Sequence, residues 1–425
     1  MTVVGWLAPG SVEEWRAGRT IHVTAALRRP AKYLNEGVAD QERLLARHGI
    51  ALVGSVKSAA MVKVVSRGPV LDEAAASIRV SVRRAMARYV GTRDAQSAAI
   101  AVAILIGDRG ALDPAGQQRH QEAGTYHVRA ISGGNIAILA GLILGAFWVI
   151  RVRGEWAAGA AIVCLAAYAY VAGVGPSVIR ATVMAVIYLA LRTIDQKTAP
   201  LHAMSVTLVA VLIAAPLSIA DVGLWLTFGA TVALVAGVNI VALPGSRWQR
   251  PVVAILAASV AAEIALVPIV AFVFQRVTIA GLAVNLAAIP CMPIVQIAAM
   301  CTAAADASGL SSIAHAAGWV AHLGVRGLIE SARLVDMAPW LTWRVPSPAI
   351  VAIVLYYVSL VAAVLLKAWT RPATISAVVL AWIMIAPQTL ARQFGDGQLH
   401  LTMMDVGQGD AMLVTLPNGK TLMID

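Results

Sequence analysis

Charged residues are scarce in this sequence. Asp, Glu, Lys and Arg make up 13% of its 425 residues, against about 25% in soluble domains. Hydrophobic residues reach 59%, and the mean hydropathy is +0.77. These values exclude a soluble globular protein of this length, and repeated long apolar runs predict a polytopic α-helical membrane protein.

Cysteine is also rare, and the N-terminus has no leader pattern. Cys164, Cys291 and Cys301 lie in separate apolar segments, an odd and scattered set that supports neither a disulfide framework nor a zinc site. The opening MTVVGWLAPG has no charged region followed by an apolar core, so it does not predict a signal peptide. The net charge of +11 fits anionic lipid and nucleic acid equally well.

Residues 1–70 predict a small soluble β domain. Polar and apolar residues alternate in short runs at 20–25, 51–56 and 61–65, and residues 38–48 have helical spacing. Strands with one short helix suit an OB-type barrel, a fold that often binds single-stranded nucleic acid. The basic cluster of Arg28, Arg29 and Lys32 could follow a phosphate backbone, and the alternative is an ordinary solvated loop.

Residues 71–110 predict two helices at the membrane surface. Residues 72–90 are amphipathic, with Arg79, Arg83 and Arg88 opposite the apolar face, so we expect this helix to lie on lipid headgroups. The apolar segment 95–107 is too short to span a bilayer, which leaves a re-entrant or an interfacial helix.

Ten candidate spans follow along residues 111–392. Positive loop residues are concentrated in alternate loops, so the positive-inside rule places those loops in the cytoplasm and both chain ends outside. Pro290 and Pro293 predict a break in the seventh span. The ten predicted spans are 131–150, 157–175, 178–194, 201–219, 222–244, 251–274, 278–305, 312–335, 348–366 and 372–391.

The segment 312–335 carries polar residues at helical spacing. These form one stripe down a single helix face. The stripe predicts either the lining of an aqueous path or a helix that lies on the membrane surface. The stripe residues are His315, Trp319, His322, Arg326, Glu330 and Arg333.

Polar groups at the boundaries and within the apolar runs are candidate site residues, since they are costly there. Backbone rich in glycine at membrane depth needs protein or water to satisfy its amides, although the pair Gly133-Gly134 could simply form a turn before a helix. Glu263 could pair with Arg180, in a structural or a functional role, and Asn285 could bond a neighbouring helix. The candidates are His127, Arg129, Ser132, Asn135, Arg180, Glu263 and Asn285.

Residues 396–425 predict a β-sheet of three strands joined by turns. The first turn lies in DVGQGD at 405–410, and the second contains Asn418-Gly419. Gly407 and Gly409 do not predict a nucleotide-binding loop, because no helix follows them.

Several of these segments together resemble the ComEC/Rec2 family of DNA-uptake channels. The similar segments stand in the family's order along the chain. A departure is Gly134-Asn135, where the family usually has an apolar residue and a second His, so the role of that His is not carried over. The matching segments are Pro30 to Ile50, Gly107-Asp108-Arg109, Ala123 to Gly133, Pro176 to Ala181, Phe274 to Pro290, and 405–410.

The resemblance implies a domain order and a limit on the chemistry. It implies an OB-like domain at 1–70, a competence-type channel domain at 111–392 and the start of a metallo-β-lactamase-like domain at 396–425. That domain binds its metal through an H-x-H-x-D-H cluster, which is absent here. We therefore expect no catalytic site and no metal site in this chain, and zinc or another divalent metal only with a complete domain. The resemblance also predicts a chain truncated at both ends.

The resulting functional prediction is a channel in the bacterial cell membrane that passes single-stranded DNA into the cytoplasm during natural transformation. His127, Arg129, Arg180 and the polar stripe would contact phosphates. Expected partners are single-stranded DNA, the lipid bilayer, an outer DNA receptor, and a cytoplasmic helicase or single-strand-binding protein. Alternatives are a secondary transporter of a small anion or lipid, whose broken helices and charges would look alike, and a membrane anchor for a partner hydrolase.

Overall fold

The computed structural model divides the chain into two compact units. One unit consists of Met1–Ala76 with Ile385–Asp425, and the other of Ser77–Met384. The structure describes residues 2–3, 14–32, 35, 40–47, 49–108, 110, 133–151, 154–173, 175–193, 200–240, 246, 249–365, 370–385, 395–406 and 409–425.

The N-terminal part of the first unit contains five short strands. They form the sheets β1-β4-β3 and β2-β5, in which β1 is parallel to β4 and the other pairs are antiparallel. The predicted helix at 38–48 is α2 (Gln41–Arg47). The described strands do not close into a barrel, so the OB-type assignment stays a prediction. The strands are β1 (Thr2–Val3), β2 (Thr20–Val23), β3 (Ala26–Arg28), β4 (Val53–Val56) and β5 (Val62–Ser66).

The C-terminal part of the same unit is an antiparallel sheet, β10-β9-β8, formed by His400–Met404 (β8), Ala411–Thr415 (β9) and Thr421–Ile424 (β10). At the second turn Gly419 has φ of 79°, a conformation that glycine adopts without strain. The Asn418 side chain accepts a hydrogen bond from the Lys420 amide (3.2 Å). The predicted succession of strand, turn, strand, turn and strand is confirmed.

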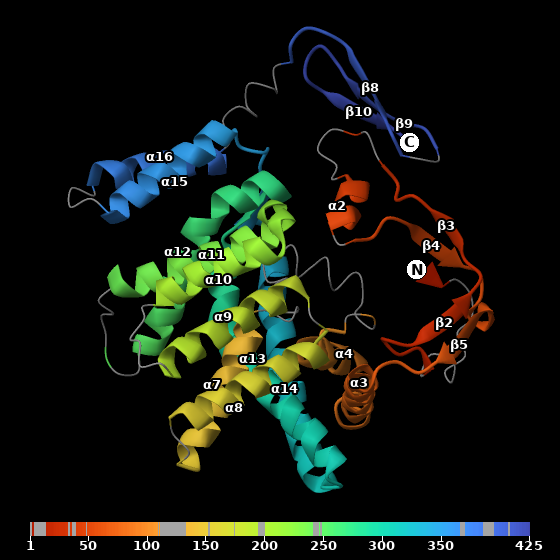
Figure 1. Ribbon diagram of the computed structural model, residues 1–425. Coiled ribbons are helices and arrows are strands. Elements are labelled where there is room, and N and C mark those ends of the chain that lie inside the picture. The colour runs from red at the N-terminus through yellow and green to blue at the C-terminus, as the bar shows by residue number, and fades with distance from the viewer. Residues whose placement is uncertain are drawn as a thin grey trace. The chain divides into compact units, whose positions relative to one another are not determined.

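The second unit is helical, as its apolar runs predict (Figure 1). Each of the ten predicted spans coincides with one helix. The helices are α3 (Val70–Tyr89), α4 (Ala95–Ile106), α7 (Gly133–Val149), α8 (Glu155–Val171), α9 (Pro176–Thr193), α10 (Pro200–Ala214), α11 (Val222–Ile240), α12 (Arg250–Phe274), α13 (Ala280–Ala307), α14 (Ser311–Met337), α15 (Ile350–Leu365) and α16 (Thr370–Ile385).

Three of these helices are long and apolar enough to cross a membrane: α9, α12 and α13. Counting only residues whose side chains the structure describes, seven further helices have apolar stretches of 10–17 residues, among them α4, α7 and α8. The helix with the polar stripe, α14, belongs to neither group. The set as a whole is that of a membrane protein, because so many apolar helices need a lipid environment.

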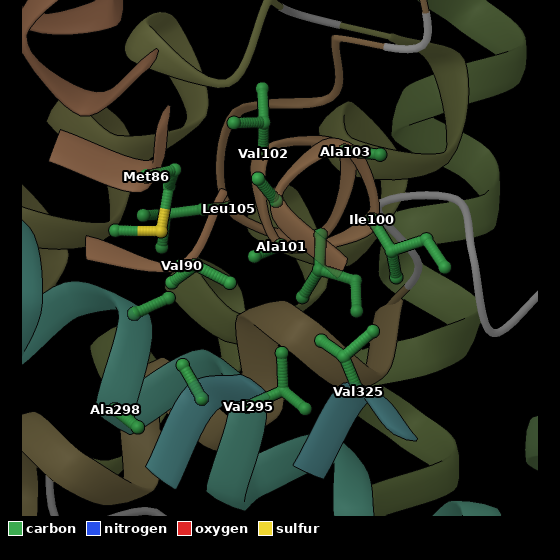
Figure 2. Packing of buried hydrophobic residues seen from close by; sticks show 14 of the residues in the cluster. Met86, Val90, Ile100, Ala101, Val102, Ala103, Leu105, Val295, Ala298 and Val325 are labelled. Carbon is green, nitrogen blue, oxygen red and sulfur yellow. The ribbon is translucent and has the colours of Figure 1, made fainter. Parts of the chain in front are cut away.

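The largest core lies where α3, α4, α13 and α14 meet. Figure 2 shows side chains of all four helices pointing toward one another, including Met86 of α3, Ile100 of α4, Val295 of α13 and Val325 of α14. Nine of the twelve residues of α4 are buried, as expected for a helix that is apolar on all faces. The apolar face of α3 packs on these same helices, and the interfacial or re-entrant position of 95–107 stays a prediction.

The prolines in the long helices do not interrupt them. Pro290 and Pro293 both lie inside the continuous helix α13, and Pro268 lies inside α12. The expected break in the seventh span is thus wrong, since neighbouring helices can satisfy the backbone groups that a proline frees. Between α12 and α13 the strand β6 (Arg276–Thr278) pairs with β7 (Thr342–Arg344), which follows α14.

Candidate functional site

The C-terminal end of α4 is held by side chains from α7 and α8. The Asn135 side-chain amide donates to the Ile104 carbonyl (3.1 Å), and the Tyr168 hydroxyl donates to the Leu105 carbonyl (3.0 Å). The Gln296 side chain of α13 donates to the Asn135 carbonyl (2.9 Å). The first two bonds satisfy carbonyls that the end of α4 leaves free. They bring together two segments that sequence analysis singled out, at 107–108 and 133–135.

The N-terminal part of α9 reaches the same region. A β-carbon on Gly133 would lie 3.5 Å from the Cβ of Ala181, so α7 and α9 are in van der Waals contact there. Arg180, the residue before Ala181, is buried. The segments around Gly107, Gly133 and Arg180 are therefore neighbours in space.

Arg180 forms an ion pair with Asp221. Its Nη1 lies 2.8 Å from Asp221 Oδ2, and its Nη2 lies 3.4 Å from Thr227 Oγ1. Asp221 also accepts the amide hydrogen of Gly223 (3.0 Å), so it caps the start of α11. The expected pairing of Arg180 with Glu263 is thus wrong. Asp221 lies in a turn and not in an apolar run, so a search for intramembrane charges could not find it.

Glu263 and Asn285 lie together at the contact between α12 and α13. The Asn285 amide donates to Ser259 Oγ (3.4 Å), and a β-carbon on Gly281 would lie 3.9 Å from Glu263 Oε2. In both helices these positions are four residues apart, so they share one helix face. The expected bond from Asn285 to a neighbouring helix is confirmed.

Buried polar atoms without a hydrogen-bond partner gather in these helices. Native proteins pair nearly all such atoms, so each marks a place where a polar ligand or water would be stabilised. Within the described part of the chain, the side-chain atoms concerned are Asn135 Oδ1, Arg180 Nε, Thr182 Oγ1, Asn285 Oδ1 and Gln296 Oε1.

The polar stripe of α14 has two parts. His315 packs edge-on against Tyr89 of α3, with ring centroids 4.8 Å apart, and His322 Nδ1 lies 3.1 Å from the Ser97 hydroxyl of α4. Farther along, Arg326 and Arg333 both pair with Glu330 and are exposed. The stripe therefore begins as packing against other helices and continues as a charged surface.

Three glycines of α14 lie where neighbouring helices approach it closely. A β-carbon on Gly318 would lie 2.9 Å from Tyr89 Cβ, one on Gly324 2.8 Å from Val295 Cγ2, and one on Gly327 2.9 Å from Cys291 Sγ. Such separations leave no room for a side chain, so α14 lies close against α3 and α13. Figure 1 shows α13 and α14 side by side.

The arginines of α3 bind protein groups, which sequence analysis missed. Arg79 donates to the carbonyls of Val171 (2.7 Å) and Tyr170 (2.9 Å), which end α8. Arg83 pairs with Asp108 (2.7 Å), and Arg88 lies 3.8 Å from Asp306. Cations are favoured at helix C-termini. The helical spacing of these arginines is the same whether they contact lipid headgroups or protein groups, so the sequence pattern does not distinguish the two.

The basic cluster of the N-terminal part is exposed. Arg28, Arg29 and Lys32 form no ion pair with a described residue, and Lys57 and Lys63 are exposed as well. By contrast, Arg19 forms hydrogen bonds to Glu73 at 2.5 and 2.9 Å. These hydrogen bonds lower the pKa of the Glu73 carboxyl to about 2. A surface of unpaired cations is thus available for an anionic partner.

Asn35 joins the two parts of the first unit. Its side chain donates to the Asp405 carbonyl (2.8 Å) and accepts from the Asp405 amide (2.6 Å). Asp405 opens the DVGQGD segment. The Asn35 side chain thus makes the same pair of hydrogen bonds to the Asp405 backbone that a residue in a neighbouring strand would make.

His127, Arg129 and Ser132 lie outside the described residues. Among the residues that the structure does describe, no group of three His, Cys, Asp or Glu side chains could hold a metal ion. Arg180 is the buried cation of the arrangement, and its ion pair with Asp221 joins α9 to the start of α11.

Comparisons with known proteins point to one family. A family model described as "Competence protein" matches residues 104–370. The chain is 26% identical over 325 residues to "Uncharacterized protein YcaI" of Escherichia coli (strain K12), which covers 72% of this chain and 41% of that protein. It is 25% identical over 198 residues to "ComE operon protein 3" of Bacillus subtilis (strain 168), covering 46% and 24%. The chain thus spans less than half the length of these relatives, and no solved structure matches it.

Proposed function

Because the chain belongs to the competence protein family of the ComEC/Rec2 type, we propose that it passes single-stranded DNA through the cell membrane into the cytoplasm. Family membership supports a role in DNA uptake in general. The matched residues 104–370 include the helices that bring Asn135, Arg180 and Gln296 together.

The observation that carries the proposal is the buried Arg180 at the start of an apolar helix. An arginine within such a helix is costly without an anionic partner. Asp221 supplies that partner, while its own carboxylate stays 42% exposed. A phosphate that displaces this exposed carboxylate would take its place on the Arg180 guanidinium, whose Nε has no hydrogen-bond partner among the described residues.

We propose that both chain ends lie on the outer side. Residues of both ends make up one compact unit, which supports an even number of membrane crossings between them. The ten helices from α7 to α16 supply such a number if all of them cross. The arginines and lysines at alternate helix ends and loops, such as Arg192 at the end of α9 and Arg371 at the start of α16, then face the cytoplasm.

The outer unit would meet DNA first. The exposed Arg28, Arg29 and Lys32 would follow its phosphates. An outer DNA receptor would deliver the strand, and a cytoplasmic helicase or single-strand-binding protein would receive it. We assign the sheet β8–β10 to the start of a metallo-β-lactamase-like domain. A complete domain of that kind would hold zinc or another divalent metal.

The proposal is tested by DNA uptake in cells that express the whole protein from a single copy. Arg180→Met should reduce natural transformation at least about tenfold per copy of protein, since the phosphate contact is lost. Arg180→Lys should retain part of the activity, because the charge survives without the fork geometry. Arg192→Met, at the exposed end of the same helix, is the matched control. Unchanged uptake per copy in Arg180→Met would contradict the proposal.

A further inference from the structure

Glu263 lies at the middle of the segment between Arg250 and Arg276, which forms most of α12. It stands thirteen residues after Arg250 and thirteen before Arg276, and no other Asp, Glu, Lys or Arg lies between these two arginines. At 1.5 Å per residue, the carboxyl group is about 20 Å from either end. Because α12 is long and apolar enough to cross a membrane, Glu263 occupies the depth at which a charge costs most.

The surroundings of Glu263 on α13 are polar but uncharged. The side chain faces Gly281, and one turn away Asn285 donates to Ser259 (3.4 Å). The other polar atom of Asn285, Oδ1, is buried and has no hydrogen-bond partner among the described residues. A protonated carboxyl group is a donor that this oxygen can accept from, whereas a carboxylate is not.

Among the described residues, the remaining elements that pack on α12 form no ion pair with Glu263. The one charged residue of α16, Arg371, lies in its first turn, whereas α16 packs on α12 through Ile383 near its other end. The sequence of α11 contains no titratable residue. The titratable groups of α15 are Tyr356 and Tyr357, whose hydroxyls donate to the carbonyls of Ile264 and Ala265 (2.7 Å each). On α13, Cys291 lies beside Gly327 of α14, and Asp306 lies near Arg88. In β6 the one titratable residue is Arg276, which marks the far end of the stretch.

We propose that Glu263 is a proton-binding site inside the membrane region, with Asn285 and Ser259 as its polar partners. A proton from the aqueous phase adds to the carboxylate and leaves from the carboxylic acid, and no other bond changes. The site would let the protein sense or use a proton gradient. This inference goes beyond DNA uptake and does not depend on the nature of the cargo.

A metal cation fits the site less well than a proton does. Calcium takes six to eight oxygen ligands and magnesium requires a near-ideal octahedron. The described residues at this place offer one carboxylate, one amide oxygen and one hydroxyl that already accepts a hydrogen bond. A proton needs only one acceptor oxygen and one oxygen as its partner.

The proposal is tested with dicyclohexylcarbodiimide, an apolar reagent that modifies protonated carboxyl groups in apolar surroundings. Membranes that contain the whole protein are treated between about pH 6 and about pH 9, and the modified peptide is quantified by mass spectrometry. Labelling of Glu263 should fall about tenfold for each pH unit above its midpoint, as the protonated fraction does. Asn285→Ala should move that midpoint to lower pH. A water-soluble carbodiimide should label Asp306 and spare Glu263.

Three results would overturn the proposal. The first is no labelling of Glu263 at any pH in the wild-type protein, and the second is a labelling rate that does not change with pH. The third is protection by sodium relative to choline at constant pH, which would assign the site to a metal cation. An unchanged midpoint in both Asn285→Ala and Ser259→Ala would remove these two residues from the site. None of these measurements involves DNA, so they do not bear on the channel proposal.

Discussion

Replacing the two partners of the Arg180–Asp221 pair should have unequal effects. The Arg180 side chain is 6% exposed and the Asp221 side chain is 42% exposed. Asp221→Asn leaves a buried positive charge without its counter-ion, which costs about 3–5 kcal/mol. Arg180→Met leaves a carboxylate that water can reach, so the lost pair should cost only about 1 kcal/mol.

Asp221→Asn isolates the charge, because an asparagine can still accept the Gly223 amide hydrogen that caps α11. The double variant should be more stable than Asp221→Asn alone, since it removes the unpaired arginine as well. Thermal midpoints in detergent at one scan rate, together with membrane abundance, rank the three variants.

The opposite order, in which Arg180→Met is the more damaging change, would contradict this prediction. Equal damage from both single variants, with no recovery in the double variant, would contradict it too. In that case the charges would be equally hydrated, and burial of Arg180 would not decide the cost.

Two further predictions concern stability. The Glu73 carboxyl has its pKa lowered from 4.5 to about 2 by its hydrogen bonds with Arg19, so its contribution is present above about pH 4.5 and is lost as the pH falls toward 2. Thermal midpoints of Glu73→Gln should therefore fall below wild type at neutral pH and converge with it near pH 2, and a constant difference would contradict this. Tyr356→Phe should cost about 1–3 kcal/mol of unfolding free energy, because Pro268 has no N–H to donate to the Ile264 carbonyl. Tyr357→Phe should cost less by chemical denaturation, since an ordinary helix bond remains available to Ala265, and equal costs would reject the explanation.

The sequence predicted the elements better than their partners. All ten spans coincide with helices, because apolar length is a local property that the chain displays directly. The partner of Arg180 was not predictable in this way, since Asp221 lies 41 residues away in a turn. The apolar face of the helix predicted at 72–90 packs against α4. An apolar face has the same pattern whether lipid or another helix covers it.

The N-terminal assignment stays open for a related reason. Alternation predicted the strands, but closure into a barrel depends on pairing between distant strands, which alternation does not encode. In α13 the prolines suggested a break, and the helix is continuous. Proline removes one hydrogen bond, and whether the helix breaks depends on the neighbours that replace it.

The bond between Asn35 and Asp405 has a consequence for how the protein is made. The two residues are 370 positions apart, and synthesis proceeds at about 5–20 residues per second, so Asn35 is made about 20–70 s before its partner. During that interval the N-terminal strands must remain folded or protected without this contact, while the helices α3 to α16 are made. The contact that joins the two parts of the first unit therefore cannot form before these helices have left the ribosome. A ribosome that stalls directly after α16 would leave the N-terminal strands without this contact.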